Sequence, residues 1–331
     1  MAASKQADFL RALYQDWTDR MVADPNLSIA NLRSMFDEWG QPALEPQNVC
    51  YESDRLGGVE AIWALPVGAD KSRAIIYTHG GGFAVGSADS HRKLAGHLAK
   101  ALDVTAVLLH YRRAPEHPFP AQIEDAVAAY KALLEKGFDA RKISTAGDSA
   151  GGNLAIASVL KIRDLRLPLP GSVIAFSPWL DMAPRGTTLE TNSATDALVG
   201  KPILEAMAGM FLGGKTDPRD PLANPLENDF KGFPPLYIAA GGDETLLSDS
   251  ETLHAKAKAQ GVKTVLSVVP GMQHVFPALS GRATIEQYLL AFNTPGVARQ
   301  GVVAPDHSVA RDCDREVVGG AGTCNSAHRL G

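Results

Sequence analysis

The stretch Gly147-Asp148-Ser149-Ala150-Gly151-Gly152 decides how the rest of this 331-residue chain is interpreted. It follows residues 142–146, which we expect to form a buried strand, and it precedes residues 153–160, which have the pattern of a helix. A serine with glycines two residues away on both sides, between strand and helix, is the G-x-S-x-G pattern of an exposed nucleophile. The glycines leave room for a sharp turn, and the following helix points N–H groups at a substrate oxyanion. The simpler interpretation is a turn whose Ser149 only caps the helix.

Strand-like and helix-like segments alternate on both sides of this stretch. Strands are predicted at residues 74–78, 104–109, 142–146, 172–176, 235–240 and 264–269, and helices at 91–102, 121–134, 248–260 and 282–292. Such alternation predicts an α/β fold with a mostly parallel central sheet and helices on both faces. Ahead of it, residues 49–52 and 59–65 flank a glycine turn and predict an antiparallel hairpin.

Two helical regions interrupt or precede this alternation. Residues 4–22 and a segment that Ser28 can cap have apolar side chains at helical spacing, and residues 198–212 form a helical insertion between two strands. These regions are expected to contribute to a cap over the carboxyl edge of the sheet. A plain N-terminal brace and ordinary core packing are the alternatives that remain open.

The chain therefore divides into four parts. Residues 1–45 are N-terminal helices contributing to the cap, and residues 46–182 with 220–293 form the catalytic domain. Residues 183–219 are the inserted cap segment. Residues 294–331 have no periodic pattern, are rich in Gly, Ala, Val, Arg and Asp, and are expected to be a disordered tail.

The bulk composition excludes several classes of function. A net charge of −5 with 21% charged residues gives no electrostatic footprint for nucleic acid or an anionic membrane. No apolar run reaches the roughly 20 residues that cross a bilayer, and the charged N-terminus does not resemble a secretory signal. Cys50, Cys313 and Cys324 are too few and too scattered for a disulfide framework or a metal site. We expect a cytoplasmic enzyme that needs no metal and no cofactor.

A glycine triplet follows the first strand of the alternating region. His79-Gly80-Gly81-Gly82-Phe83 lies where that strand ends, and consecutive glycines let backbone N–H groups face a cleft without side chains in the way. A flexible turn explains a glycine triplet alone. Together with a downstream serine turn, it predicts an oxyanion hole.

A serine hydroxyl needs a base, and the base needs a carboxylate that orients it. Asp243 follows one predicted strand and His274 follows the next, in the order Ser, acid, His that hydrolases of this architecture use. Each residue alone has a simpler interpretation, as a helix cap for Asp243 and a surface loop residue for His274. Glu244 is the nearest rival carboxylate, whereas Asp249 lies too far into the next helix.

Several motifs in this order resemble the hormone-sensitive-lipase-like branch of the α/β-hydrolases, the bacterial family IV esterases. The resemblance rests on His79-Gly80-Gly81-Gly82-Phe83, residues 111–121, Gly147-Asp148-Ser149-Ala150-Gly151-Gly152, Ser177-Pro178-Trp179-Leu180-Asp181, Gly242-Asp243-Glu244 and His274-Val275-Phe276. It covers residues 1–293 and leaves the tail unmatched. Arg113 stands where the family usually has leucine, which affects no catalytic role.

The resemblance implies an α/β-hydrolase fold with a helical cap and assigns the site. It makes Ser149 the nucleophile, His274 the base and then the acid, Asp243 the orienting carboxylate, and the N–H groups of Gly81, Gly82 and Ala150 the oxyanion hole. His79 is expected to brace the glycine loop, and Asp148 to support the serine turn.

The expected function is a serine carboxylesterase acting on short to medium acyl esters, because a cap leaves a bounded pocket. The candidate pocket walls are Phe83, Met207, Met210, Phe211 and Phe276, with core packing as the alternative for the three cap residues. A lactone, carbamate or amide hydrolase with the same triad is the close alternative, and a non-catalytic small-molecule receptor is the distant one. The last strand, residues 264–269, is a candidate edge for a homodimer.

Overall fold

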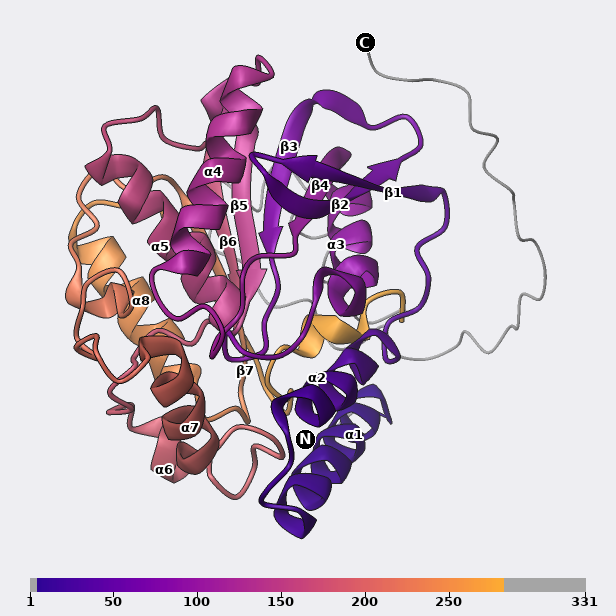
Figure 1. Ribbon diagram of the computed structural model, residues 1–331, viewed down its shortest axis with the longest axis vertical. Helices are drawn as coiled ribbons and strands as arrows, with labels where there is room; N and C mark the ends of the chain where they lie inside the picture. The colour runs from indigo at the N-terminus through magenta and orange to yellow at the C-terminus, as the bar shows by residue number, and fades with distance from the viewer. Residues whose placement is uncertain (1–4, 283–331) are drawn as a thin grey trace.

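The computed structural model describes residues 5–282, which are built around one eight-stranded sheet (Figure 1). Its strands are β1 (Val49–Leu56), β2 (Val59–Pro66), β3 (Asp70–Thr78), β4 (Val104–Leu109), β5 (Ile143–Asp148), β6 (Ser172–Phe176), β7 (Leu236–Gly241) and β8 (Thr264–Val269). They are ordered β1-β2-β4-β3-β5-β6-β7-β8. β1 pairs with β2 and β2 pairs with β4 in antiparallel fashion, while β4, β3 and the remaining strands are mutually parallel. The prediction of a mostly parallel sheet is confirmed.

Helices cover both faces of this sheet. The helices are α1 (Lys5–Ala23), α2 (Ile29–Asp37), α3 (Ala88–Leu102), α4 (Ala121–Glu135), α5 (Ala150–Asp164), α6 (Thr188–Thr191), α7 (Lys201–Leu212) and α8 (Leu247–Ala259), with 3₁₀ turns at Glu38–Gly40, Ala140–Lys142, Pro225–Glu227 and Phe276–Leu279. Crossovers between parallel strands are right-handed. Since the β3-to-β4 step runs opposite to the later steps across the sheet, α3 lies on one face and α4, α5 and α8 lie on the other.

That reversal creates the crevice in which a site can form. The chain leaves β3 toward the face of α3 and leaves the neighbouring strand β5 toward the face of α5. The loops after the two strands therefore diverge at the carboxyl edge of the sheet, which is where ligands bind in open α/β sheets. Ser149 directly follows β5, and the glycine triplet follows β3 after His79.

The N-terminal helices are held by an aromatic cluster. Tyr14 and Trp17 of α1 pack against Phe36 of α2 and Trp39 of the next turn, with ring centroids between 5.0 and 6.1 Å apart. All four side chains are buried. In Figure 1, α1 and α2 lie at the same end of the molecule as α6 and α7, near the carboxyl ends of the strands. Both helical regions therefore lie at that edge of the sheet.

The boundaries of the elements follow local chemistry. Ser28 caps α2 by accepting a hydrogen bond from the Asn31 N–H, as predicted. α3 begins three residues before the predicted helix because Ser87 and Ser90 form a reciprocal capping box. The helix predicted at residues 282–292 lies outside the described residues apart from its first residue, and so does the tail.

The prediction about the cysteines is not tested by the described residues, because Cys50 lies in β1 whereas Cys313 and Cys324 lie outside them. Among residues 5–282, no helix is long and apolar enough to cross a membrane.

Candidate active site

Ser149 occupies a strained turn between β5 and α5. Its backbone has φ 52° and ψ −122°, a conformation that a non-glycine residue seldom adopts. The turn requires close backbone approach, since a Cβ on Gly147 would lie 2.3 Å from the Gly151 carbonyl oxygen, and one on Gly151 would lie 2.0 Å from that of Thr78. The Ser149 N–H donates to the Phe176 carbonyl at 2.9 Å, which ties the turn to β6. The Ser149 backbone is thereby fixed at the N-terminus of α5, in the strand-to-helix turn that the G-x-S-x-G pattern predicted.

The glycine loop lies beside Ser149 in the same pocket. Gly81 and Gly82 have positive φ values of 107° and 58° and line this pocket together with Ser149. A Cβ on Gly81 would meet the Val85 carbonyl oxygen at 2.2 Å, so only glycine fits there. Ala150, the third residue expected to supply an oxyanion-hole N–H, is the first residue of α5. The three backbone groups therefore come from the loops after the neighbouring strands β3 and β5.

Asp148 connects these two loops beneath the pocket. Its Oδ1 accepts hydrogen bonds from the Tyr77 hydroxyl at 2.7 Å and the Gly80 N–H at 3.2 Å, and its Oδ2 lies 3.2 Å from Nε2 of His91. The carboxylate is fully buried. Asp148 thus supports both the serine turn and the glycine loop, in agreement with its expected role.

His79 braces the glycine loop. Its ring stacks on Tyr111 with centroids 4.2 Å apart, and the Tyr111 hydroxyl donates to the His79 carbonyl at 2.7 Å. Burial lowers the pKa of His79 well below its usual range, with a further contribution from nearby His91. A neutral, immobilised imidazole suits a bracing role rather than proton transfer.

His274 lines the pocket together with Ser149, and a buried carboxylate lies behind it. The carboxylate is Glu244, whose Oε2 is 3.6 Å from Nδ1 of His274. This separation is slightly longer than a hydrogen bond, and Nδ1 has no hydrogen-bond partner within the described part of the chain. Both side chains are at most 1% exposed. The pair is arranged as an imidazole with its orienting carboxylate.

This arrangement corrects the expected position of Asp243. Asp243 points outward, where its carboxylate lies 3.6 Å from the Arg11 guanidinium of α1 and its side chain is 29% exposed. Successive residues of the tight turn after β7 face opposite sides, because the Asp243 N–H is held by the Met272 carbonyl while Glu244 turns inward. Glu244, the rival carboxylate of the sequence analysis, therefore takes the place beside His274.

Burial and neighbouring charges shift the pKa values of Glu244 and His274 in opposite directions. Burial raises the pKa of Glu244 above its ordinary value, although His274, Ser177 and the Gly241 N–H counteract part of that shift. For His274, burial lowers the pKa, but Glu244, together with Asp196 and Asp148, outweighs this effect and the net pKa lies above that of free imidazole. A raised pKa makes the imidazole a stronger base for the Ser149 hydroxyl.

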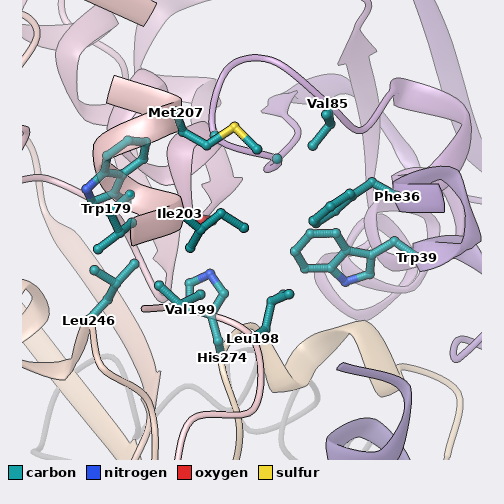
Figure 2. A pocket seen from close by; sticks show the side chains of 14 residues that line it. Phe36, Trp39, Val85, Trp179, Leu198, Val199, Ile203, Met207, Leu246 and His274 are labelled. Atoms are coloured by element: carbon teal, nitrogen blue, oxygen red, sulfur yellow. The ribbon is translucent and has the colours of Figure 1, made fainter. Parts of the chain in front are cut away.

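The pocket itself is almost entirely apolar. It encloses about 420 Å³, including its opening to solvent. Besides Ser149, His274, Gly81 and Gly82, its walls are Phe36, Trp39, Val85, Trp179, Leu198, Val199, Ile203, Leu204, Met207 and Leu246. Figure 2 shows the side chains of the N-terminal helical region and those of α7 facing each other across this space. The pocket therefore lies between the two helical regions and the sheet.

Of the five predicted pocket residues, only Met207 lines this pocket. Phe83 and Phe211 instead stack on each other, with centroids 3.8 Å apart, and both are buried in the core. Met210 is partly buried against the same core, and Phe276 is buried in the 3₁₀ turn after His274. For the cap residues Met210 and Phe211 the core-packing alternative holds, whereas for Phe83 and Phe276 the predicted place in the pocket wall is wrong, because both are buried in the core away from the cavity.

The helical regions also hold the histidine loop in place. The Tyr14 hydroxyl of α1 donates to the His274 carbonyl at 2.9 Å. The Gln273 side chain accepts from the Ala197 N–H and donates to the Thr195 carbonyl, both at 2.9 Å. Contacts from both the N-terminal helices and the inserted segment thus converge on residues 273 and 274, and the covering helices are part of the site's support.

Comparison with known proteins supports one family. A family model of the alpha/beta hydrolase fold matches residues 75–278. An acetyl-hydrolase of Streptomyces hygroscopicus is 39% identical over 290 residues, covering 86% of this chain and 95% of that protein. An esterase of Acinetobacter venetianus is 34% identical over 261 residues, covering 78% of this chain and 85% of that protein.

Solved structures agree with these relatives. A crystal structure of an esterase from the bacterial hormone-sensitive lipase family superposes with a TM-score of 0.81 at 36% identity, covering 89% of this chain and all of that one. The crystal structure of EstE5 soaked with p-nitrophenyl butyrate has a TM-score of 0.78 at 35% identity, covering 87% of this chain and 98% of that one.

Proposed function

Because this chain belongs to the hormone-sensitive-lipase-like branch of the α/β-hydrolase family and is a carboxylic-ester hydrolase, we propose that it works through an acyl-enzyme on Ser149. The observation that supports this most strongly is the strained Ser149 turn, which opens into the pocket that His274 and the glycine loop also line. In this proposal His274 takes the proton of the Ser149 hydroxyl as the oxygen attacks the ester carbonyl. The N–H groups of Gly81, Gly82 and Ala150 stabilise the oxyanion that forms.

The proposed cycle continues with three further proton transfers. Protonated His274 gives its proton to the departing alkoxide, which leaves as the alcohol, and the acyl group remains on Ser149. His274 then takes a proton from a water molecule as the water oxygen attacks the acyl carbon, and it gives this proton to the Ser149 oxygen as the acyl–oxygen bond breaks, which releases the carboxylic acid and restores the Ser149 hydroxyl. Glu244 stabilises the imidazolium that exists between these steps and fixes its orientation, the role that the sequence analysis gave to Asp243.

We propose that short to medium acyl esters are the preferred substrates. The supporting features are the apolar lining of the pocket and its position between the two helical regions and the sheet. No charged side chain other than that of the catalytic candidate His274 lines this pocket among the described residues. Such walls favour an uncharged acyl chain and exclude a charged one.

Rates on a series of p-nitrophenyl esters test this preference. p-Nitrophenyl butyrate is a suitable reference ester, since EstE5 was soaked with it. We expect kcat/KM to be largest for acyl chains of about two to eight carbons, because each added methylene contributes about 0.8 kcal/mol only while it fits the pocket. A maximum at palmitate would contradict the proposal. Parallel measurements with lactone and amide substrates determine whether ester cleavage is preferred over those alternatives.

We also propose a homodimer formed through β8. This strand is the last one of the described sheet, and Val268 on it is 37% exposed. An unpaired strand edge is a template for pairing with a second copy of the same edge. Sedimentation velocity of the full chain is expected to give the mass of a dimer, and Val268→Lys is expected to shift it toward the monomer. A monomer at all concentrations of the unaltered protein would contradict the proposal.

A further inference from the structure

Ser177 has an unusual position at the end of β6. Its backbone φ is +45°, in the left-handed region, and its side chain is fully buried. Its N–H donates to the Ala239 carbonyl of the neighbouring strand β7 at 2.6 Å. A non-glycine residue in this conformation is maintained only when its surroundings fix it. The Ser177 hydroxyl therefore has a defined position at the carboxyl edge of the sheet.

This hydroxyl joins the two loops that carry the acid and the base. Its Oγ donates to Oε2 of Glu244 at 2.6 Å and accepts from the Val275 N–H at 3.0 Å. A hydroxyl has one hydrogen, and the Val275 N–H can only donate, so the hydroxyl hydrogen must point at the carboxylate. Oε2 is also the oxygen that lies 3.6 Å from Nδ1 of His274. Because Oγ of Ser177 accepts from Val275 and must donate its hydrogen to Glu244, Oε2 has to accept this hydrogen bond.

We propose that Ser177 is a positioning residue that holds Glu244 ionised and aligned with His274. The inference rests on the proposed roles of these two residues in ester hydrolysis. Within residues 5–282, the Ser177 hydroxyl and the Gly241 N–H are the hydrogen-bond donors to Oε2, and Oε1 has no partner. Ser177 is therefore the side-chain donor that offsets the burial of this carboxylate. Its second bond fixes the residue that follows His274.

The charged and titratable groups around the pair come from several elements. Besides each other, His274 and Glu244 face Tyr14 of α1, Asp148 before the serine turn, Asp196 of the inserted segment and Asp249 of α8. Asp148 and Asp196 raise the pKa of His274 further, but less than Glu244 does. None of these groups forms a hydrogen bond with Ser177 among the described contacts. A change confined to Ser177 therefore reports on the Glu244 and His274 pair.

The pH dependence of kcat distinguishes positioning from simple packing. In the unaltered enzyme, activity requires neutral His274 and is expected to be lost as the pH falls through its raised pKa. Removing the hydroxyl leaves Glu244 with one donor fewer, so the pair binds its proton more tightly and titrates at higher pH. For Ser177→Ala we expect kcat to be about 10- to 100-fold lower, KM to stay within about twofold, and the acid limb to shift to higher pH.

Two further variants test whether the loss of activity comes from the missing hydroxyl, and not from the backbone conformation or from the change of a buried serine as such. Ser177→Gly also lacks the hydroxyl but suits a left-handed φ, so it is expected to lose activity as Ser177→Ala does and serves if the alanine variant does not fold. Ser250 of α8 is equally buried and its hydroxyl has no partner among the described residues, so Ser250→Ala is the matched control, expected to keep the unaltered pH profile. Thermal unfolding of each variant checks that the fold is intact.

The outcomes are distinguishable. An unaltered kcat and acid limb in folded Ser177→Ala would overturn the inference, and so would full activity in Ser177→Gly, because the backbone would then be the cause. A Ser149→Ala variant that keeps its activity would instead contradict the acyl-enzyme itself. The role of Ser177 is supported if both Ser177 variants show a reduced kcat and a shifted acid limb while Ser250→Ala keeps the kcat and the acid limb of the unaltered enzyme.

Discussion

Replacing Ser149 with alanine is expected to lower kcat for p-nitrophenyl butyrate by about 10⁴- to 10⁶-fold, because hydrolysis then loses its nucleophile. The alanine side chain fits the strained turn as well as serine does, since Ser149 makes its turn through backbone hydrogen bonds to Phe176 and Trp179. The fold and the apolar pocket should therefore survive. The residual rate should reflect only binding and the oxyanion-hole N–H groups.

The control for this variant is binding. The loss should appear in kcat, while the affinity for a non-hydrolysable ester analogue should stay within about threefold, because the pocket walls contribute the binding energy. Ser158→Ala is a matched control, as Ser158 is a buried serine of α5, the helix that follows Ser149, and among residues 5–282 its hydroxyl donates to the Ala155 carbonyl of the same helix. Residual activity above about one per cent in Ser149→Ala would contradict the assignment of the nucleophile.

The second large effect separates the two adjacent carboxylates. Glu244→Gln is expected to lower kcat by about 10³- to 10⁴-fold, since an amide next to Nδ1 no longer stabilises the imidazolium and favours the wrong tautomer. Asp243→Asn is expected to stay within about threefold. Its partner Arg11 is 44% exposed, and exposed ion pairs contribute only about 0 to 1 kcal/mol.

Kinetic measurements on the two variants, with melting temperatures as the fold control, decide between the carboxylates. Glu244→Gln also leaves Ser177 with an amide in place of its charged acceptor, so some loss of stability is expected as well. If Asp243→Asn were inactive and Glu244→Gln were active, the orienting role would belong to Asp243 after all.

Much of this architecture could be predicted from local patterns. The G-x-S-x-G stretch and the glycine triplet specify their backbone turns directly, because a Cβ at Gly81 or Gly151 would collide with a carbonyl oxygen. The alternation of strands and helices then places both turns, and His274, at one edge of a parallel sheet. Such backbone turns can be predicted because they require glycine at particular positions, and glycine is visible in the sequence.

The choice between Asp243 and Glu244 could not be predicted in the same way. Adjacent residues in a turn differ in direction, and which one faces inward depends on long-range contacts. Here the Met272 carbonyl holds the Asp243 N–H, and Ser177, 67 positions before Glu244, binds its carboxylate. The preceding glycine motif is compatible with either acid, so the sequence alone left both open.

The pocket walls were also beyond sequence reasoning. Trp39 and Phe36 belong to helical turns whose apolar face was expected, but only the packing of α1 and α2 at the carboxyl edge brings them to the cavity. Trp179 belongs to the Ser177-Pro178-Trp179-Leu180-Asp181 motif, yet nothing local indicates that it lines the pocket with Ser149. Conversely, Phe83 and Phe211 stack on each other in the core, so of the predicted wall residues Met207 is the one that lines the pocket.

The location of a covalent label tests the central claim most directly. The full-length enzyme is treated with an organophosphate such as diethyl p-nitrophenyl phosphate, and the modified residue is identified by peptide mass spectrometry. The account predicts one diethylphosphoryl group on Ser149, appearing in step with the loss of esterase activity, and no label on Ser149→Ala. Complete inactivation with the label on another residue, or a folded and active enzyme that leaves Ser149 unmodified, would contradict it.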